Sequence, residues 1–240
     1  MTTTSTVPDL ERVELAVSDG TTMIGHVARP AGNVKTAPGV IVLQDAYGWT
    51  NFLADTVQRF ADAGFLAIAP EFYHRDGPGI TMPYDEELLR RGERPTLTRE
   101  GEMADGKAAY AWLEDETGHD RIAAYGFCMG GRIAYLLNAQ VPLKAAVSFY
   151  GVAPTYDECD KQRSPILMIW AGLDHHIKLA ERRGMADALH AAGAKHDQLV
   201  FGDAHHGFFC HARPEIYSAK ATNQSWAIGM QFFRDNGVFG

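Results

Sequence analysis

The sequence IAAYGFCMGG at residues 122–131 joins a run of apolar residues to a segment with helical spacing. The apolar run is typical of a strand buried on both faces, and residues 130–138 are typical of a helix. Between them lies the pattern Gly126-x-Cys128-x-Gly130, in which cysteine replaces the serine of a nucleophile elbow. Glycines two residues before and after the cysteine leave the space that such a tight turn requires. The stretch therefore predicts a strand, a strained turn carrying Cys128, and a helix.

The rest of the chain repeats this alternation of strand and helix. Residues 12–17 and 22–28 are predicted to form an antiparallel hairpin around the turn Asp19-Gly20. Further strands are predicted at 39–44, 65–70, 122–127, 145–150, 165–171 and 198–201, and helices at 51–63, 99–116, 130–138, 179–192 and 215–233. Residues 73–98, rich in proline and glycine, are predicted as a cap-like excursion. The pattern predicts an α/β protein with a mostly parallel sheet, a leading antiparallel hairpin and helices on both faces. We find no linker or repeat, so residues 1–240 are predicted to form a single domain.

Composition narrows the kinds of partner and compartment. The chain has 240 residues and a formal net charge of −8, which argues against nucleic acid and anionic membranes as partners. Its apolar runs are too short to span a bilayer, and the polar segment Met1–Asp9 does not have the pattern of a signal peptide. The odd number of cysteines, none close to another in sequence, makes a disulfide framework unlikely and favours a reducing cytoplasm. We find no cofactor motif and expect a small-molecule substrate.

Reactive side chains follow several of the predicted strands. Ligands of such sheets bind beyond the carboxyl ends of the strands, and Asp45, Cys128, Asp174 and the pair His205-His206 all occupy that position. A thiol nucleophile needs a base that is oriented by a third group, and the chain order nucleophile, acid, histidine is the order found in this architecture. The backbone N–H after the cysteine, at the start of the following helix, is expected to face an oxyanion. Spacing alone does not choose between the two histidines.

Each of these residues also has a simpler interpretation. Cys128 could be a buried structural cysteine, and Asp174 could cap the helix that follows it. The loops also contain a plausible set of metal ligands: Asp174, His175, His176, Asp203, His205 and His206. Adjacent histidines usually point in different directions, however, and neither E-x-x-H nor CxxC spacing is present. We therefore expect no metal, and keep a non-catalytic redox-sensing or binding protein with a reactive Cys128 as an alternative.

Four motifs together resemble the dienelactone hydrolases, which are cysteine-nucleophile members of the α/β-hydrolase fold. They are GFCMGG at 126–131, GLD at 172–174, HGF at 206–208 and QDAYG at 44–48. The resemblance covers nearly the whole chain and implies cleavage of a small ester or lactone through an acyl-thioester intermediate. It implies the following roles: Cys128 as nucleophile, Asp174 as acid, His206 as base, and the N–H groups of Ala46 and Met129 as the oxyanion hole. An esterase or thioesterase acting on another small substrate is the alternative activity.

The chain departs from the family pattern at positions near the expected site. Asp45 stands where the family carries the glutamate that gates the thiol, and it is one methylene shorter. The family's substrate-binding arginines have possible counterparts in Arg90 and Arg91, but Cys210 occupies the position four residues after the histidine. Three tyrosines fall in loops near the expected site, where they either line it or pack at its rim: Tyr47, Tyr73 and Tyr150.

Overall fold

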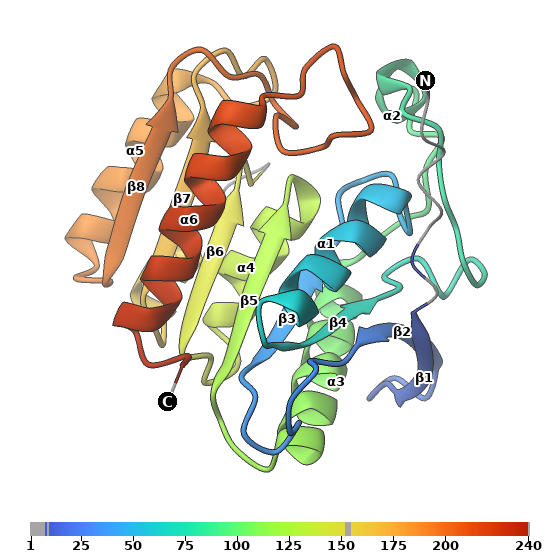
Figure 1. Ribbon diagram of the computed structural model, residues 1–240. Helices are drawn as coiled ribbons and strands as arrows, with labels where there is room; N and C mark the ends of the chain where they lie inside the picture. Colours follow the sequence, from blue (N-terminus) through green and yellow to red (C-terminus); the bar gives the residue numbers. More distant parts are fainter. Residues whose placement is uncertain (1–7, 9, 152–154, 240) are drawn as a thin grey trace.

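The computed structural model describes residues 8, 10–151 and 155–239, and its strands and helices alternate after a leading hairpin (Figure 1). Most of the segment Met1–Asp9, for which we predicted no signal peptide, lies outside the described residues. The strands are β1 (Glu11–Ala16), β2 (Thr22–Ala28), β3 (Gly39–Leu43), β4 (Leu66–Pro70), β5 (Ile122–Phe127), β6 (Ala145–Phe149), β7 (Ile166–Ala171) and β8 (His196–Phe201). The helices are α1 (Asn51–Asp62), α2 (Glu86–Arg90), α3 (Arg99–Thr117), α4 (Met129–Asn138), the 3₁₀ helix η1 (Tyr156–Lys161), α5 (Leu179–Ala191) and α6 (Ala219–Asp235).

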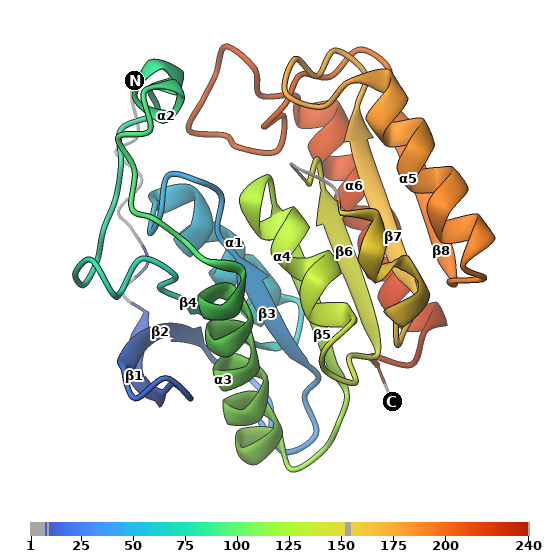
Figure 2. The ribbon, with the colours of Figure 1, turned by 180° about the vertical axis from the view of Figure 1, so that it is seen from behind.

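The eight strands form one sheet in the order β1-β2-β4-β3-β5-β6-β7-β8. Strands β1, β2 and β4 pair antiparallel, and every pair from β4 to β8 is parallel. Helices α1 and α6 cover one face of the sheet, and α3, α4 and α5 cover the other (Figures 1 and 2). Strands β3 to β7 are buried along their whole length, as their near-continuous apolar sequences require. The predicted fold class is confirmed.

The chain reverses its direction of travel across the sheet beside β3. It runs from β3 to β4 on one side and later returns to β5 on the other, where Leu43 pairs with Gly126. A crevice forms where the strand order reverses in this way, just beyond the carboxyl ends of the two strands. Asp45 follows one of these strands and Cys128 follows the other, so the topology brings these residues together.

Three elements differ most from the sequence prediction. Helix α6 begins at Ala219 rather than at residue 215, because the Ser218 hydroxyl caps it by accepting a hydrogen bond from the N–H of Ala221. Helix α2 lies inside the predicted excursion at 73–98, and η1 was not predicted either. Among the described residues, no helix has both the length and the apolar character needed to cross a membrane.

The elbow glycines are required because neighbouring backbone fills the space beside them. A methyl group on Gly130 would overlap the carbonyl oxygens of Leu43 and Gln44 at the end of β3. We expect Gly130→Ala to lower the free energy of unfolding by about 3 kcal/mol or more, because backbone cannot move aside as a side chain can. Gly32→Ala is the matched control, since nothing lies within 4 Å of the added methyl group. Urea unfolding followed by circular dichroism measures both, and equal stabilities for the two variants would contradict this steric argument.

Candidate active site

A cavity of about 350 Å³ opens at the crevice beyond β3 and β5. Eight of the residues that we predicted for the site line it: Asp45, Ala46, Tyr47, Arg90, Cys128, Met129, Tyr150 and His206. These residues come from four separate loops, from α2 and from the first residue of α4, so the fold rather than the local sequence brings them together.

Cys128 occupies a strained backbone conformation between β5 and α4. Its φ of 54° and ψ of −112° are unusual for a residue with a side chain. The conformation is held because the Cys128 N–H donates to the carbonyl of Phe149 at 2.9 Å and α4 begins at the next residue. The thiol is half-buried and stands at the N-terminus of α4, where the helix dipole favours a thiolate.

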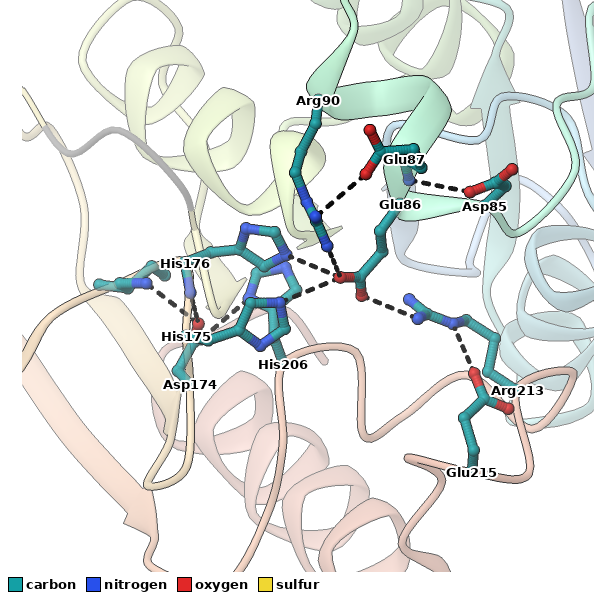
Figure 3. Close-up of polar contacts among 11 residues, drawn as sticks. Asp85, Glu86, Glu87, Arg90, Asp174, His175, His176, His206, Arg213 and Glu215 are labelled. Carbon is teal, nitrogen blue, oxygen red and sulfur yellow. Dashed lines mark hydrogen bonds and ion pairs between the residues drawn. The ribbon is translucent and has the colours of Figure 1, made fainter.

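His206 and Asp174 form a hydrogen-bonded pair across the loops after β8 and β7 (Figure 3). Nδ1 of His206 lies 2.8 Å from Oδ2 of Asp174, and the carboxylate is fully buried. The other carboxylate oxygen, Oδ1, accepts hydrogen bonds from the N–H groups of His176 and Ile177. These bonds fix the carboxylate, which in turn orients the His206 ring. His205 is exposed to solvent, so the structure places only His206 in the cavity.

The surroundings of this pair set its charge state. Burial alone raises the pKa of Asp174, but the hydrogen bond from His206 and the two from backbone N–H groups outweigh it and lower that pKa. Burial likewise disfavours the His206 imidazolium, yet the adjacent Cys128 side chain and the Asp174 carboxylate raise the pKa of His206. Nε2 of His206 is buried and has no hydrogen-bond partner among the described residues. The arrangement therefore orients the ring through Nδ1 and leaves Nε2 for proton transfer.

Two backbone N–H groups are candidates for binding an oxyanion. Met129 is the first residue of α4, where a backbone N–H has no partner within the helix. Ala46 lies in the loop after β3, and the Tyr73 hydroxyl fixes this loop by donating to the Ala46 carbonyl at 2.9 Å. The N–H of Tyr47 donates to Asp45 Oδ1, also at 2.9 Å, which tightens the same turn. Both candidate N–H groups thus belong to restrained backbone at the cavity wall.

Asp45 is buried in the cavity wall, and burial raises its pKa from 3.8 to about 6 despite the hydrogen bond from the Tyr47 N–H. As the pH rises from about 4 to 6, the unfolded chain loses this proton before the folded chain does, so ionisation of Asp45 destabilises the fold over that window. We expect Asp45→Asn, which keeps the hydrogen-bond acceptor, to be about 2–3 kcal/mol more stable than the parent at pH 7 and equally stable at pH 4. Urea unfolding at several pH values measures this difference. A difference that stays constant from pH 4 to 7 would contradict it.

Two of the predicted substrate-binding residues lie outside the cavity lining. Tyr73 is buried behind the loop whose carbonyl it binds. Arg91 points away, with about half of its side chain exposed, and pairs with Glu93 at 2.7 Å. Its neighbour Arg90, the last residue of α2, does line the cavity.

Several side chains without a predicted site role also line the cavity, among them Glu86, Arg94, Arg132 and Arg213. His176, considered above only as a metal ligand, lines it as well. Glu86 accepts a hydrogen bond from Arg213 at 2.9 Å, although the two residues are 127 positions apart. No local sequence pattern predicts such a contact. The one sequence signal for this part of the site was the group of arginines in and near the predicted excursion at 73–98.

The excursion covers the site because backbone hydrogen bonds join it to the loop after β3. The Trp49 N–H donates a hydrogen bond to the carbonyl of Ile80, and the Met82 N–H donates a hydrogen bond to the carbonyl of Tyr47. From there the chain passes into α2, whose residues Glu86, Leu89 and Arg90 form one wall of the cavity. The segment 73–98, predicted as a cap-like excursion, thus contributes residues to one wall of the cavity.

The sheet order, the elbow after β5 and the histidine–aspartate pair after β8 and β7 define a hydrolase of the α/β-hydrolase fold. The family model described as "Dienelactone hydrolase family" matches residues 23–237, and the chain belongs to this family. The chain is 33% identical over 232 residues to a protein of Escherichia coli O157:H7 named "Putative carboxymethylenebutenolidase", covering 92% of this chain and 85% of the relative. A protein of the same name from Synechocystis sp. is 30% identical over 224 residues, with 88% and 90% covered.

Solved structures agree with this assignment. The crystal structure named "Putative Dienelactone Hydrolase" from Klebsiella pneumoniae superimposes with a TM-score of 0.82 at 28% identity. The alignment covers 94% of this chain and 98% of that one. The family resemblance predicted from the four sequence motifs is therefore confirmed.

Proposed function

We propose that this protein hydrolyses a small ester or lactone through Cys128, His206 and Asp174. The observation that carries the proposal is the His206–Asp174 pair in the cavity that also holds the strained elbow cysteine. The pair has a 2.8 Å hydrogen bond, and the buried Nε2 of His206 has no hydrogen-bond partner among the residues that the structure describes. A redox-sensing protein would need the reactive cysteine but not the oriented histidine and its carboxylate.

In the proposed mechanism Cys128 passes its proton to His206 and attacks the carbonyl carbon as thiolate. The N–H groups of Ala46 and Met129 bind the oxygen of the tetrahedral intermediate; removing one such donor typically costs about 10²–10³ in rate. The intermediate expels an alcohol or enolate, which takes the proton from His206, and leaves an acyl-thioester on Cys128. His206 then takes a proton from a water that attacks the thioester, and the second tetrahedral intermediate breaks its C–S bond, releases the acid product and returns the sulfur of Cys128, which recovers the proton. Asp174 keeps the ring in the required tautomer throughout. Asp45, buried nearby, would influence release of the thiol proton.

Charge at the cavity favours a substrate with an anionic group. Arg132 and Arg213 line it but already pair with Glu102 and Glu86. Arg94 also lines it and has no carboxylate within 4.0 Å among the described residues. We assign the substrate anion to Arg94, with Arg90 as the second candidate, and place Tyr47 and Tyr150 against the rest of the substrate. The names of the curated relatives favour a lactone that bears a carboxylate.

We further propose a single domain acting in the cytoplasm. The three cysteines are free, and Cys159 and Cys210 are buried thiols whose pKa burial raises, to about 11 for Cys210. A reducing compartment suits a protein whose reactive thiol must stay free.

The test is titration with iodoacetamide while hydrolysis of p-nitrophenyl acetate and of a carboxylate-bearing lactone is followed. Because the other two thiols are buried, alkylation should fall first on Cys128, and both activities should disappear in step with that one modification. Comparing the lactone with its methyl ester tests the proposed role of Arg94, since neutralising the carboxylate should raise KM. Activity that survives complete alkylation of Cys128 would overturn the proposal.

A further inference from the structure

A second group of chemically capable side chains lies at the rim of the cavity. Glu86 reaches from α2 toward two consecutive histidines in the loop after β7 (Figure 3). Its Oε2 lies 3.1 Å from Nε2 of His175 and 4.0 Å from Nε2 of His176. One ligand atom from each of the three residues falls within 4.8 Å of the other two. The mechanism proposed above uses none of these three side chains.

The side chains of His175 and His176 both face the Glu86 carboxylate, because the loop turns sharply just after Asp174. The rings of His175 and His176 lie 4.1 Å apart between centroids, with an interplanar angle of 39°. The turn is held by Asp174 Oδ1, which accepts the N–H groups of His176 and Ile177. The expectation from sequence that adjacent histidines point in different directions is wrong for this pair.

The hydrogen bonds of Glu86 hold its carboxylate in a suitable orientation. Oε1 of Glu86 accepts a hydrogen bond from the Arg213 guanidinium at 2.9 Å. The other oxygen, Oε2, is therefore directed at the histidines. Metal-binding carboxylates are commonly oriented by such an outer hydrogen bond. Arg90 lies 3.9 Å from Oε2 but pairs more closely, at 3.1 Å, with Glu87, so an ion beside Oε2 would displace only a long contact.

Two imidazoles and one carboxylate form a ligand set for a divalent first-row transition metal, with water as the fourth ligand. Bonds of about 2.0–2.2 Å in tetrahedral geometry place the ligand atoms roughly 3.3 Å apart. The distances of 3.1 and 4.0 Å from Oε2 require only small side-chain rotations to reach that arrangement. The three side chains are partly exposed, which leaves an ion a path of entry from solvent.

We propose that Glu86, His175 and His176 bind a divalent transition-metal ion such as Zn²⁺, which fastens α2 to the loop after β7 and reversibly inhibits the enzyme. Glu86 and His176 line the cavity that holds Cys128, so an ion between them fixes the wall beside the nucleophile. The His176 ring also lies 4.6 Å from the His206 ring, so the ion adds positive charge near the base. The inhibitory role rests on the proposed function; the metal site does not.

The test is titration of the metal-free protein with Zn²⁺ by calorimetry and, in parallel, with Co²⁺ by its visible absorption. We expect one equivalent to bind, and His175→Ala and Glu86→Gln to weaken binding at least about tenfold. His205→Ala removes an exposed histidine from the neighbouring loop and should bind as the parent does. Cys128→Ala, which removes the accessible thiol, should also bind normally. No binding at all, equal binding by His175→Ala, or loss of binding in Cys128→Ala would each overturn the site.

The effect on the rate is measured separately, as the fractional inhibition of each variant relative to its own metal-free rate. Zn²⁺ should inhibit the parent and the His205→Ala protein, EDTA should restore the rate, and His175→Ala should resist inhibition. Binding that leaves the rate of the parent unchanged would overturn the inhibitory role. A protein with no esterase activity would contradict the proposed function, while the calorimetric result would still decide the metal site.

Discussion

Replacing Cys128 by alanine is expected to lower kcat/KM for ester hydrolysis by about 10⁴- to 10⁶-fold. The loss is large because the variant has no atom that can form the acyl intermediate, although the N–H groups of the elbow remain. The fold should survive, since alanine and cysteine meet similar strain at the φ of 54° that this position adopts. Steady-state hydrolysis of p-nitrophenyl acetate measures the rate, and the urea midpoint measures the fold.

Cys159→Ala is the control for this experiment. That thiol is buried beside Tyr135 and does not line the cavity, so its removal should leave the rate close to that of the parent. A Cys128→Ala protein that is folded and retains full activity would show that another group attacks the substrate.

The second large effect is expected from His206→Ala, with a loss of at least about 10⁴-fold in kcat/KM. Without this ring, no base at the cavity is oriented by Asp174 to take the thiol proton or to activate water. His205→Ala changes the neighbouring residue of the same loop, but its side chain is exposed to solvent and should leave the rate nearly unchanged. Kinetics of the two variants with one ester substrate give the comparison.

The reverse result, with His205→Ala inactive and His206→Ala active, would contradict the geometry of the site. Asp174→Asn should also lower the rate strongly, because it keeps the shape of the acid but favours the wrong tautomer of His206. Its cost in a comparable triad is about 10⁴-fold.

Local patterns predicted most of the sheet because the buried strands are short apolar runs bounded by glycine, proline or polar residues. The elbow was predictable because its glycine spacing is also a local pattern. Backbone within contact distance requires glycine at positions Gly126 and Gly130. One hydrogen bond joins Asp174 to His206, which lie 32 positions apart, and chain order together with the family motifs was enough to pair them.

The remaining parts depend on contacts that no local pattern records. Helix α2 has five residues and buries none of them fully, so it lacks the apolar periodicity that identifies longer helices. Because this helix was not predicted, the sequence could not show that Arg90 lines the cavity and that Arg91 does not. The position of Glu86 between Arg213 and the two histidines depends on how the excursion folds back over the sheet, which the sequence of residues 73–98 does not specify.

The most direct test of the central claim is to trap the acyl-thioester on Cys128. The protein is mixed with p-nitrophenyl acetate, quenched in acid during the first turnover, and analysed by intact mass and peptide mapping. We predict a burst of p-nitrophenol and one acetyl group on the peptide containing Cys128, removable by neutral hydroxylamine as a thioester is. Continued turnover with no acetylated Cys128, or with the acetyl group on another residue, would contradict the account.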